Sequence, residues 1–214
     1  MRIRNVKNKE EIISNSKFVV KNYFKYIGRW NELFGNDNPI YIEIGMGKGK
    51  FLRENAIKYP DINFIGIERC DSIIAKSLLN IDDDITNLLV IRMNALDIDK
   101  VFSKEISRIY LNFSDPWPKL RHHLRRLSSN IFLDKYDKIF KDTKEIYMRT
   151  DNKDLFIYSL ESFSNHGYFL QDISFDLHND TLEELITTEY EDKFSSKNMP
   201  IYSVKVSSIK CIKK

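Results

Sequence analysis

From residue 40 onwards, short runs of hydrophobic residues alternate with segments whose hydrophobic residues recur every three or four positions. The short runs predict buried β-strands and the periodic segments predict helices. Such alternation is typical of an α/β fold with an open, mostly parallel sheet and helices on both faces. The pattern predicts seven strands, over residues 40–44, 63–67, 88–92, 109–113, 145–149, 168–177 and 202–211. It predicts helices over residues 50–59, 72–79, 125–140 and 155–163.

The ends of these elements carry further local signals. Asp71 stands where the second of these helices would begin and is expected to be its N-cap, and Asp151 or Asn152 is expected near the cap of the last. No long crossover helix separates the last two strands, so we expect them to finish the sheet as an antiparallel pair.

The residues before the first strand, 1–38, predict an N-terminal arm and an edge helix. Arg2, Arg4, Lys7 and Lys9 make the arm basic, which fits either a solvated tail or an arm that touches RNA. Apolar residues then recur at steps of three to five, which predicts helical or irregular structure whose side chains join the core. These residues are Phe18, Tyr23, Phe24, Ile27, Trp30, Leu33 and Phe34.

Length and composition narrow the class of protein. The 214 residues, 42% of them hydrophobic, suit one globular domain over residues 1–214. The formal net charge is only +3, so any attraction for nucleic acid has to come from local clusters of cations. Cys70 and Cys211 lie far apart without neighbouring Cys/His spacing, which indicates no metal site or disulfide framework and favours a cytoplasmic setting. No apolar run is long enough to predict a membrane span.

The first candidate binding feature is the turn after the first predicted strand. Gly45, Gly47 and Gly49 occupy alternate positions there, which lets the backbone turn tightly and approach a ligand beside a helix N-terminus. A purely structural turn would use glycine in the same way. The spacing G-x-G-x-G differs from the dinucleotide fingerprint G-x-G-x-x-G, since position 50 is Lys50, and this argues against a nicotinamide enzyme.

Polar residues also follow the ends of the next strands, where sheets of this class bind ligands. Glu68 lies about 20 residues beyond the glycine turn, placed to accept hydrogen bonds from both hydroxyls of a ribose, unless it is a solvated strand end. Asn94 follows the third strand and could read an adenine edge. Glu43 is expected behind the glycine turn, where it accepts hydrogen bonds from backbone N–H groups or faces the positive centre of a cofactor. The glycine turn and Glu68 together predict a nucleoside cofactor.

The fourth strand leads into an acidic turn and then a cationic run. Pro116 and Pro118 restrict the backbone on either side of Trp117, so Asp115 is expected to be held rigidly at the strand end. A structural turn can have the same composition. The cationic run predicts contact with nucleic-acid phosphates, although such runs also form solvated faces. Its members are Lys119, Arg121, His122, His123, Arg125 and Arg126.

Five motifs together make the chain resemble the bacterial tRNA (guanine-N7)-methyltransferase family. They are IEIGMGKGKF (42–51), FIGIE (64–68), LNFSDPWPK with RHHLRRL (111–127), RTDN (149–152) and TEYEDKFS (188–195). The similarity runs over nearly the whole chain, and DPWPK and TEYE are specific to this family among methyltransferases. The resemblance implies a class I, Rossmann-like methyltransferase fold, S-adenosylmethionine as cofactor, and a guanine in the variable loop of tRNA as methyl acceptor.

The resemblance also implies roles for individual residues. Asp115 matches the family's catalytic carboxylate. The implied cofactor-binding residues are Asp115, Glu43, Glu68, Asn94 and the glycines of the turn. The implied substrate-binding residues are Lys119, Asp151, Thr188, Glu189, Tyr190 and Glu191. The implied RNA-contacting residues are Arg121, His122, His123, Leu124, Arg125 and Arg126. His123 and Leu124 stand where the family usually has a charged pair, and Asn198 stands where it commonly has glycine.

Methylation at guanine N7 needs little acid–base chemistry, because N7 already carries an in-plane lone pair and alignment is the main requirement. We expect Asp115 to accept a hydrogen bond from the guanine edge and to offset the positive charge that develops on the purine. Trp117 would either stack on the base or pack under the loop. Two rival functions remain at this point: a non-catalytic RNA-binding module, which has no need of Glu68 or Asp115, and a nicotinamide-dependent oxidoreductase.

Overall fold

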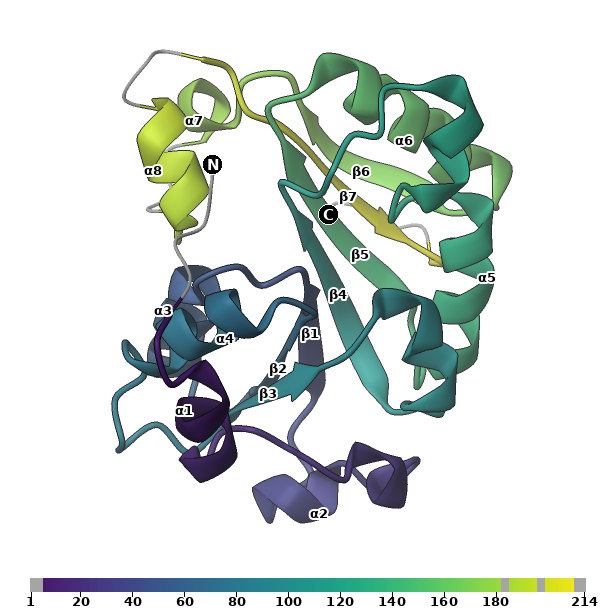
Figure 1. Ribbon diagram of the computed structural model, residues 1–214. Helices are drawn as coiled ribbons and strands as arrows, with labels where there is room; N and C mark the ends of the chain where they lie inside the picture. The colour runs from purple at the N-terminus through teal and green to yellow at the C-terminus, as the bar shows by residue number, and fades with distance from the viewer. Residues whose placement is uncertain (1–5, 182–184, 196–198, 210–214) are drawn as a thin grey trace.

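A seven-stranded sheet forms the centre of the computed structural model, which describes residues 6–181, 185–195 and 199–209 (Figure 1). The strand order is β3-β2-β1-β4-β5-β7-β6, and β1 to β5 are mutually parallel, whereas β7 runs antiparallel to both β5 and β6. This confirms the predicted sheet and its antiparallel finish. The strands are β1 (Ile40–Ile44), β2 (Asn63–Glu68), β3 (Leu88–Arg92), β4 (Ile106–Asn112), β5 (Glu145–Thr150), β6 (Phe169–Ser174) and β7 (Tyr202–Ser207).

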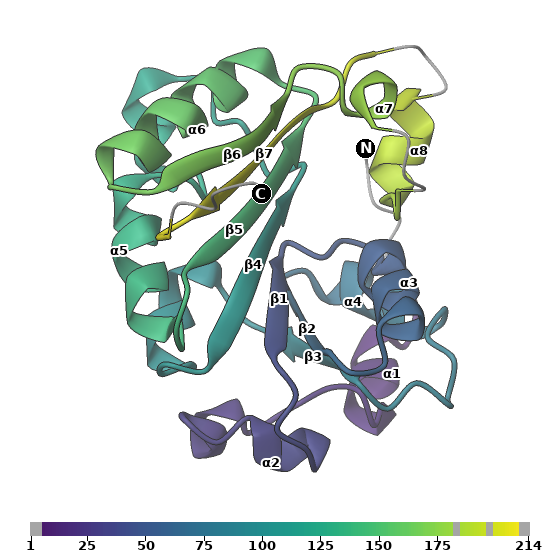
Figure 2. The same ribbon diagram turned by 180° about the vertical axis from the view of Figure 1, so that it is seen from behind.

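Helices lie on both faces of the sheet, as the sequence predicts. Helices α1, α3 and α4 cover one side, and α5 and α6 cover the other (Figures 1 and 2). The α-helices are α1 (Lys9–Asn15), α2 (Asn31–Phe34), α3 (Lys50–Lys58), α4 (Asp71–Leu78), α5 (Asn130–Ile139), α6 (Lys153–Asn165), α7 (Leu177–Asp180) and α8 (Glu189–Ser195). The 3₁₀ helices are η1 (Tyr23–Tyr26), η2 (Ala95–Lys100) and η3 (Leu120–Arg125).

Alternate residues of the strands feed two separate hydrophobic clusters. In β2, Phe64 packs into the cluster beneath α1, α3 and α4, whereas Ile65 and Ile67 pack into the cluster beneath α5 and α6. All three side chains are at most 1% exposed. A parallel strand with helices on both faces has to be apolar at every position, which is why its sequence reads as a continuous hydrophobic run.

The two edges of the sheet are treated differently. At the β3 edge, Val20 donates a backbone hydrogen bond to Val90 (3.0 Å) and Val90 donates one to Phe18 (2.8 Å), so the N-terminal segment pairs with the edge strand at Val90. At the β6 edge the pairing with β7 shifts register between Gln171 and Ser174. Asp172, inside this bulge, has a φ of +45°.

The predicted helix over residues 125–140 is wrong in its first part. Leu120–Arg125 is a 3₁₀ helix, and Arg126 is extended with φ −63° and ψ 134°. Helix α5 begins only at Asn130, after an extended N-cap residue, Ser129. The break places the side chain of Arg126 against the loop that precedes η3, where it donates to the carbonyl of Pro116.

Two other predictions meet mixed outcomes. Asn152 accepts a hydrogen bond from the backbone N–H of Leu155 (2.8 Å) and so caps α6 as expected. Asp71, by contrast, is not the N-cap of α4: Cys70 holds that position, and the Asp71 carboxylate pairs with Arg92 at 3.1 Å.

The N-terminal segment is irregular and only partly buried. Trp30 is fully buried, but Phe24 and Ile27 are 58% and 42% exposed, so their prediction as core residues is wrong. The predicted basic arm becomes helical at Lys9, where α1 begins. Among the residues singled out in the sequence, Arg2, Arg4, Asn198 and Cys211 lie outside those that the structure describes.

Candidate active site

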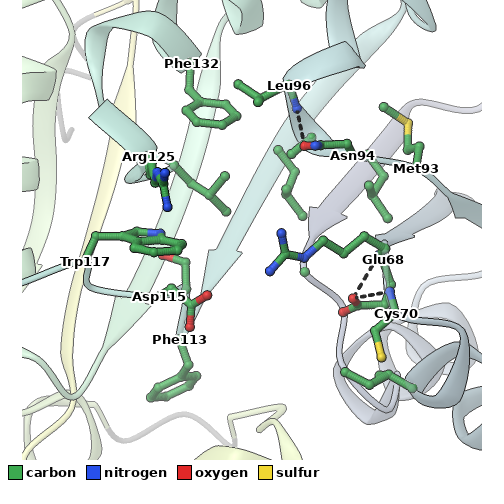
Figure 3. Close-up of a pocket in the computed structure, with 18 residues that line it drawn as sticks. Glu68, Cys70, Met93, Asn94, Leu96, Phe113, Asp115, Trp117, Arg125 and Phe132 are labelled. Atoms are coloured by element: carbon green, nitrogen blue, oxygen red, sulfur yellow. Dashed lines mark hydrogen bonds between the residues drawn. The ribbon is translucent and has the colours of Figure 1, made fainter. Parts of the chain in front are cut away.

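The carboxyl ends of the first four strands border a cleft of about 820 Å³. It lies where the sheet order reverses, between β1 and β4, which is the usual ligand position in open α/β sheets. Figure 3 shows Glu68 and Asp115 on opposite sides of the cleft, with Asn94 on the side of Glu68. The lining residues that bear on chemistry are Gly45, Glu68, Asn94, Asp115, Trp117 and Arg125.

The glycine turn needs glycine for two different reasons. All three glycines have left-handed φ angles, +81° for Gly45, +59° for Gly47 and +80° for Gly49, which other residues adopt only with strain. A β-carbon on Gly49 would also lie 2.4 Å from the hydroxyl oxygen of Ser77 in α4, whereas β-carbons on Gly45 and Gly47 would meet nothing within 4 Å. Gly45 borders the cleft itself, and the space where its β-carbon would stand is open.

Glu68 is held by backbone groups at the start of α4. Its Oε1 accepts hydrogen bonds from the backbone N–H groups of Arg69 (2.8 Å) and Cys70 (2.9 Å). These contacts fix the carboxylate beside the cleft and leave Oε2 available as an acceptor for ligand hydroxyls (Figure 3).

Asn94 caps the short helix that follows β3. Its Oδ1 accepts a hydrogen bond from the backbone N–H of Leu96 (3.0 Å). This engagement fixes the amide orientation, so its NH₂ group is the part that can reach a ligand in the cleft.

The loop that carries Asp115 has an unusual backbone. Phe113 and Trp117, on either side of Asp115, have φ angles of +50° and +42°. For bulky residues such angles cost about 1–3 kcal/mol each and persist only where the surroundings impose them. Asp115 itself is exposed to the cleft, and within the described part of the chain no hydrogen bond or ion pair engages its carboxylate.

This loop is contacted by β5, by Arg126 at the end of η3 and by Tyr190 of α8. The backbone N–H of Phe113 donates to the carbonyl of Arg149 (2.8 Å) at the end of β5. The guanidinium of Arg126 donates from Nε to the carbonyl of Pro116 (2.9 Å) and from Nη2 to that of Trp117 (3.3 Å). The guanidinium of Arg126 also lies over the ring of Tyr158 in α6, whose centre is 4.3 Å from the guanidinium carbon.

Glu43 does not make the first of the two contacts expected for it, and the second, with the positive centre of a cofactor, stays a prediction. It is 1% exposed, and its Oε1 accepts a hydrogen bond from the side chain of Asn112 (2.8 Å) and not from backbone N–H groups of the glycine turn. Among the described residues its Oε2 has no hydrogen-bond partner. Burial raises the pKa of the Glu43 carboxyl to about 8, with the hydrogen bond from Asn112 acting against the shift.

The TEYE segment has a structural role that the sequence already signalled. Thr188 Oγ1 accepts from the backbone N–H of Glu191 (3.0 Å), and Glu191 Oε2 accepts from the backbone N–H of Thr188 (3.3 Å). This reciprocal pair is a capping box, whose signature T-x-x-E is visible in the sequence. Nη1 of Arg149 donates hydrogen bonds to Oε2 of Glu191 (3.3 Å) and to the carbonyl of Ile186 (2.7 Å). The sequence pattern does not predict that Arg149 holds the start of α8 through these hydrogen bonds.

Of the other predicted substrate residues, Tyr190 lies beside the loop of Asp115 and contacts Asp151. The hydroxyl of Tyr190 donates to Asp151 Oδ2 (3.2 Å), and its ring lies 5.0 Å from that of Phe113. Glu189 precedes Tyr190 in α8 and is partly exposed. Lys119 is exposed at the start of the cationic run. The substrate role predicted for these residues and for the capping box stays a prediction.

The cationic run presents two kinds of side chain. Arg121 and Arg125 are exposed, whereas His122, His123 and Arg126 are half-buried. Arg125 lies over the ring of Trp117 (5.0 Å) at the rim of the cleft, and His122 lies 5.7 Å from the same ring. Trp117 therefore forms part of the cleft wall and does not pack under the loop. Leu124, 43% exposed, interrupts the charge.

Two further features of the described residues concern metals and membranes. These residues contain no group of three or more His, Cys, Asp or Glu side chains arranged to hold a metal ion. Within the same ranges, none of the helices has the length and apolar character that crossing a membrane requires.

Comparison with known proteins gives consistent matches. A family model described as "Putative methyltransferase" matches residues 37–204. A Geobacillus sp. (strain WCH70) protein named tRNA (guanine-N(7)-)-methyltransferase is 49% identical over 209 residues, covering 96% of this chain and 95% of its own length. A Bacillus subtilis (strain 168) protein of the same name is 46% identical over 197 residues, covering 91% and 92%.

Solved structures match more distantly and bear on the fold alone. An antibiotic-related methyltransferase has a TM-score of 0.61 at 18% identity, covering 84% of this chain and 92% of its own. The 16S rRNA (adenine(1408)-N(1))-methyltransferase from Catenulisporales acidiphilia has a TM-score of 0.60 at 11% identity, covering 86% and 94%. The predicted methyltransferase fold is thereby confirmed.

Proposed function

Because the chain belongs to the family of tRNA (guanine-N(7)-)-methyltransferases, we propose that it transfers a methyl group from S-adenosylmethionine to N7 of a guanine in tRNA. The observation that carries the proposal is the cleft at the carboxyl ends of β1 to β4, with Glu68 on one side and Asp115 on the other. A non-catalytic RNA-binding module would require neither carboxylate. The proposed acceptor lies in the variable loop of the tRNA.

The residues of the cleft fit the cofactor. Glu68 offers its second carboxylate oxygen to the ribose hydroxyls, and Asn94 offers its NH₂ group to the adenine edge. Gly45 lets the backbone come close to the ligand because no β-carbon stands in the way. The buried Oε2 of Glu43, which lacks a partner in the described structure, suits a nearby positive charge. Glu68 would therefore hold the ribose, whereas Glu43, which is buried and does not line the cleft, would act on the positive charge from behind the glycine turn.

Methyl transfer to N7 requires the protein to align the base with the methyl donor and to stabilise positive charge on the purine. Bound S-adenosylmethionine supplies a methyl group on a positively charged sulfur. Asp115 accepts a hydrogen bond from a donor on the guanine edge, which orients N7 toward that methyl group. Its negative charge also offsets the positive charge that forms on the purine as N7 is alkylated. Trp117, already in the cleft wall, offers its ring for stacking with the base.

Replacing Glu68 with Gln should weaken S-adenosylmethionine binding by about 10- to 100-fold, because hydrogen bonds to a charged acceptor contribute roughly 1.5–3 kcal/mol. The Gln side chain keeps an oxygen for the N–H groups of Arg69 and Cys70, so the fold should be retained. Isothermal titration calorimetry measures the affinity. Glu161→Gln, an exposed change on α6, is the control. If the Glu68 variant and the control bound S-adenosylmethionine with equal affinity, Glu68 would not bind the ribose hydroxyls.

Replacing Arg121 and Arg125 with Ala should weaken tRNA binding and make it less sensitive to salt. Removal of one arginine–phosphate interaction is expected to reduce the slope of log K against log salt by about 1. Both side chains are exposed on η3, so the change removes charge without opening the core. Filter binding over a salt series measures the slope. A slope equal to that of the wild-type protein would place both residues outside the RNA interface.

The reaction itself is tested by transfer of labelled methyl from S-adenosylmethionine to unmodified tRNA, with strand scission to map the modified guanine. We expect label at a guanine in the variable loop. The same tRNA with 7-deazaguanosine at that position is the matched control, because it lacks the N7 lone pair and should accept no label. Absence of transfer to the unmodified tRNA would favour a binding module, and label on the 7-deaza tRNA would exclude N7 as the acceptor.

A further inference from the structure

The loop 113–117 needs to be held from both ends, because the residues on either side of Asp115 have left-handed backbone angles. Its first end is fixed by the sheet, through the hydrogen bond from Phe113 N–H to the carbonyl of Arg149 (2.8 Å). Its second end, at Pro116 and Trp117, lies beyond the strands, so the sheet ladder does not reach it. A group outside the sheet has to fix that end.

Arg126 is the side chain that binds the backbone of the second end in the described structure, whereas Arg125 and His122 contact the ring of Trp117. Its Nε and Nη2 donate to two successive carbonyls of the loop, at 2.9 Å on Pro116 and 3.3 Å on Trp117. The planar guanidinium is suited to such a two-point contact because its N–H groups diverge in a fixed fork. The ring of Tyr158, 4.3 Å away, covers it from α6. Arg126 therefore connects the loop of Asp115 to a helix on one face of the sheet.

The neighbouring arginines of the cationic run behave differently. Arg121 and Arg125 are exposed, whereas Arg126 is half-buried. A phosphate contact by Arg126 would compete with its bonds to the loop carbonyls and with its packing on Tyr158. The extended backbone at Arg126, which ends η3, is what turns its side chain toward the loop.

We propose that Arg126 is a positioning residue that fixes the 113–117 loop, and with it Asp115, and is not an RNA-phosphate contact. This inference rests on the proposed function where it concerns the rate, because Asp115 is the catalytic carboxylate only under that proposal. The coupling to Tyr158 makes α6 part of the same support. Arg126 directly follows η3, so a tRNA bound to η3 would contact a segment that is hydrogen-bonded to the loop of Asp115.

Kinetics and binding together separate a positioning role from a phosphate contact. In Arg126→Ala, kcat at saturating tRNA and S-adenosylmethionine should fall about 10- to 100-fold, since small displacements of a catalytic group have effects of that size. The salt slope of tRNA binding should stay at the wild-type value, whereas Arg121→Ala should reduce it by about 1. Arg126→Lys, which keeps the charge but not the fork, should recover only part of kcat. A reduced salt slope with wild-type kcat would overturn the proposal.

A second measurement does not depend on activity. The chain has two tryptophans, and Trp30 is fully buried, so quenching of fluorescence by acrylamide reports mainly on Trp117. Arg126→Ala should increase the quenching, and Tyr158→Leu, which leaves the charges of η3 intact, should do so as well. Quenching at the wild-type level in both variants would overturn the proposal. If the protein methylated no tRNA, the proposed function would fail while the quenching result would still decide whether Arg126 holds the loop.

Discussion

Replacing Asp115 with Asn is expected to lower the rate constant of methyl transfer within the bound complex by about 100- to 1000-fold at saturating cofactor and tRNA. The change keeps the shape of the side chain and removes its negative charge, so it removes the stabilisation of positive charge on the purine. Losing one preorganised electrostatic group of this kind typically has an effect of that size. Single-turnover transfer of labelled methyl measures it, with cofactor saturation verified separately because Asp115 also borders the cofactor cleft.

Asp83→Asn is the matched control for Asp115→Asn. The side chain of Asp83 is 94% exposed and pairs with Lys17, away from the cleft, so its loss of charge should leave the rate unchanged. If Asp115→Asn transferred methyl at nearly the rate of this control, Asp115 would not be the catalytic carboxylate.

Replacing Glu43 with Gln is expected to change how the stability of the cofactor-free protein depends on pH. Burial raises the pKa of Glu43 from 4.5 to about 8, so between these values the folded state holds a proton that the unfolded state has released. The free energy of unfolding contributed by this group is therefore fully present below pH 4.5, falls as the pH rises, and levels off above about 8. The total loss is on the order of a few kcal/mol.

Gln carries no ionisable group and can still accept the hydrogen bond from Asn112. The variant should consequently be more stable than the natural protein at pH 8.5 and should lose the decline between pH 5 and 8. Urea unfolding at a series of pH values measures this. Glu11→Gln, on the exposed side of α1, controls for the loss of one negative charge. A decline of equal size in the Glu43 variant would mean that another group causes it.

Much of the fold could be predicted from local patterns. The strands are short apolar runs between helical segments, and parallel strands covered on both faces leave that signature regardless of tertiary detail. Glu68 could be placed for a similar reason, because its position follows from the end of one strand and the distance from the glycine turn. The cap of α6 could be narrowed to Asp151 or Asn152 because capping depends on residues a few positions apart, and the structure shows Asn152 in that role.

Features that depend on distant contacts could not be predicted in this way. The extended backbone that turns Arg126 toward the loop, and the ring of Tyr158 that packs on its guanidinium, depend on tertiary contacts, and the periodicity of residues 125–140 gives no sign of either. The hydrogen-bond partner of Glu43 comes from β4, whose register against β1 is a property of the sheet. The capping box of Thr188 and Glu191, by contrast, has a local signal, the spacing T-x-x-E. The resemblance implies only substrate binding for these two residues.

The two edges of the sheet bear on how the protein behaves at high concentration. An open strand edge is a template on which a second molecule can add a strand, and runs of such additions lead to aggregates. Here residues 18–20 pair with the β3 edge at Val90, and the bulge at Asp172 interrupts the regular spacing of the β6 edge. The addition of a regular strand from a second molecule is therefore disfavoured at both edges of the described sheet.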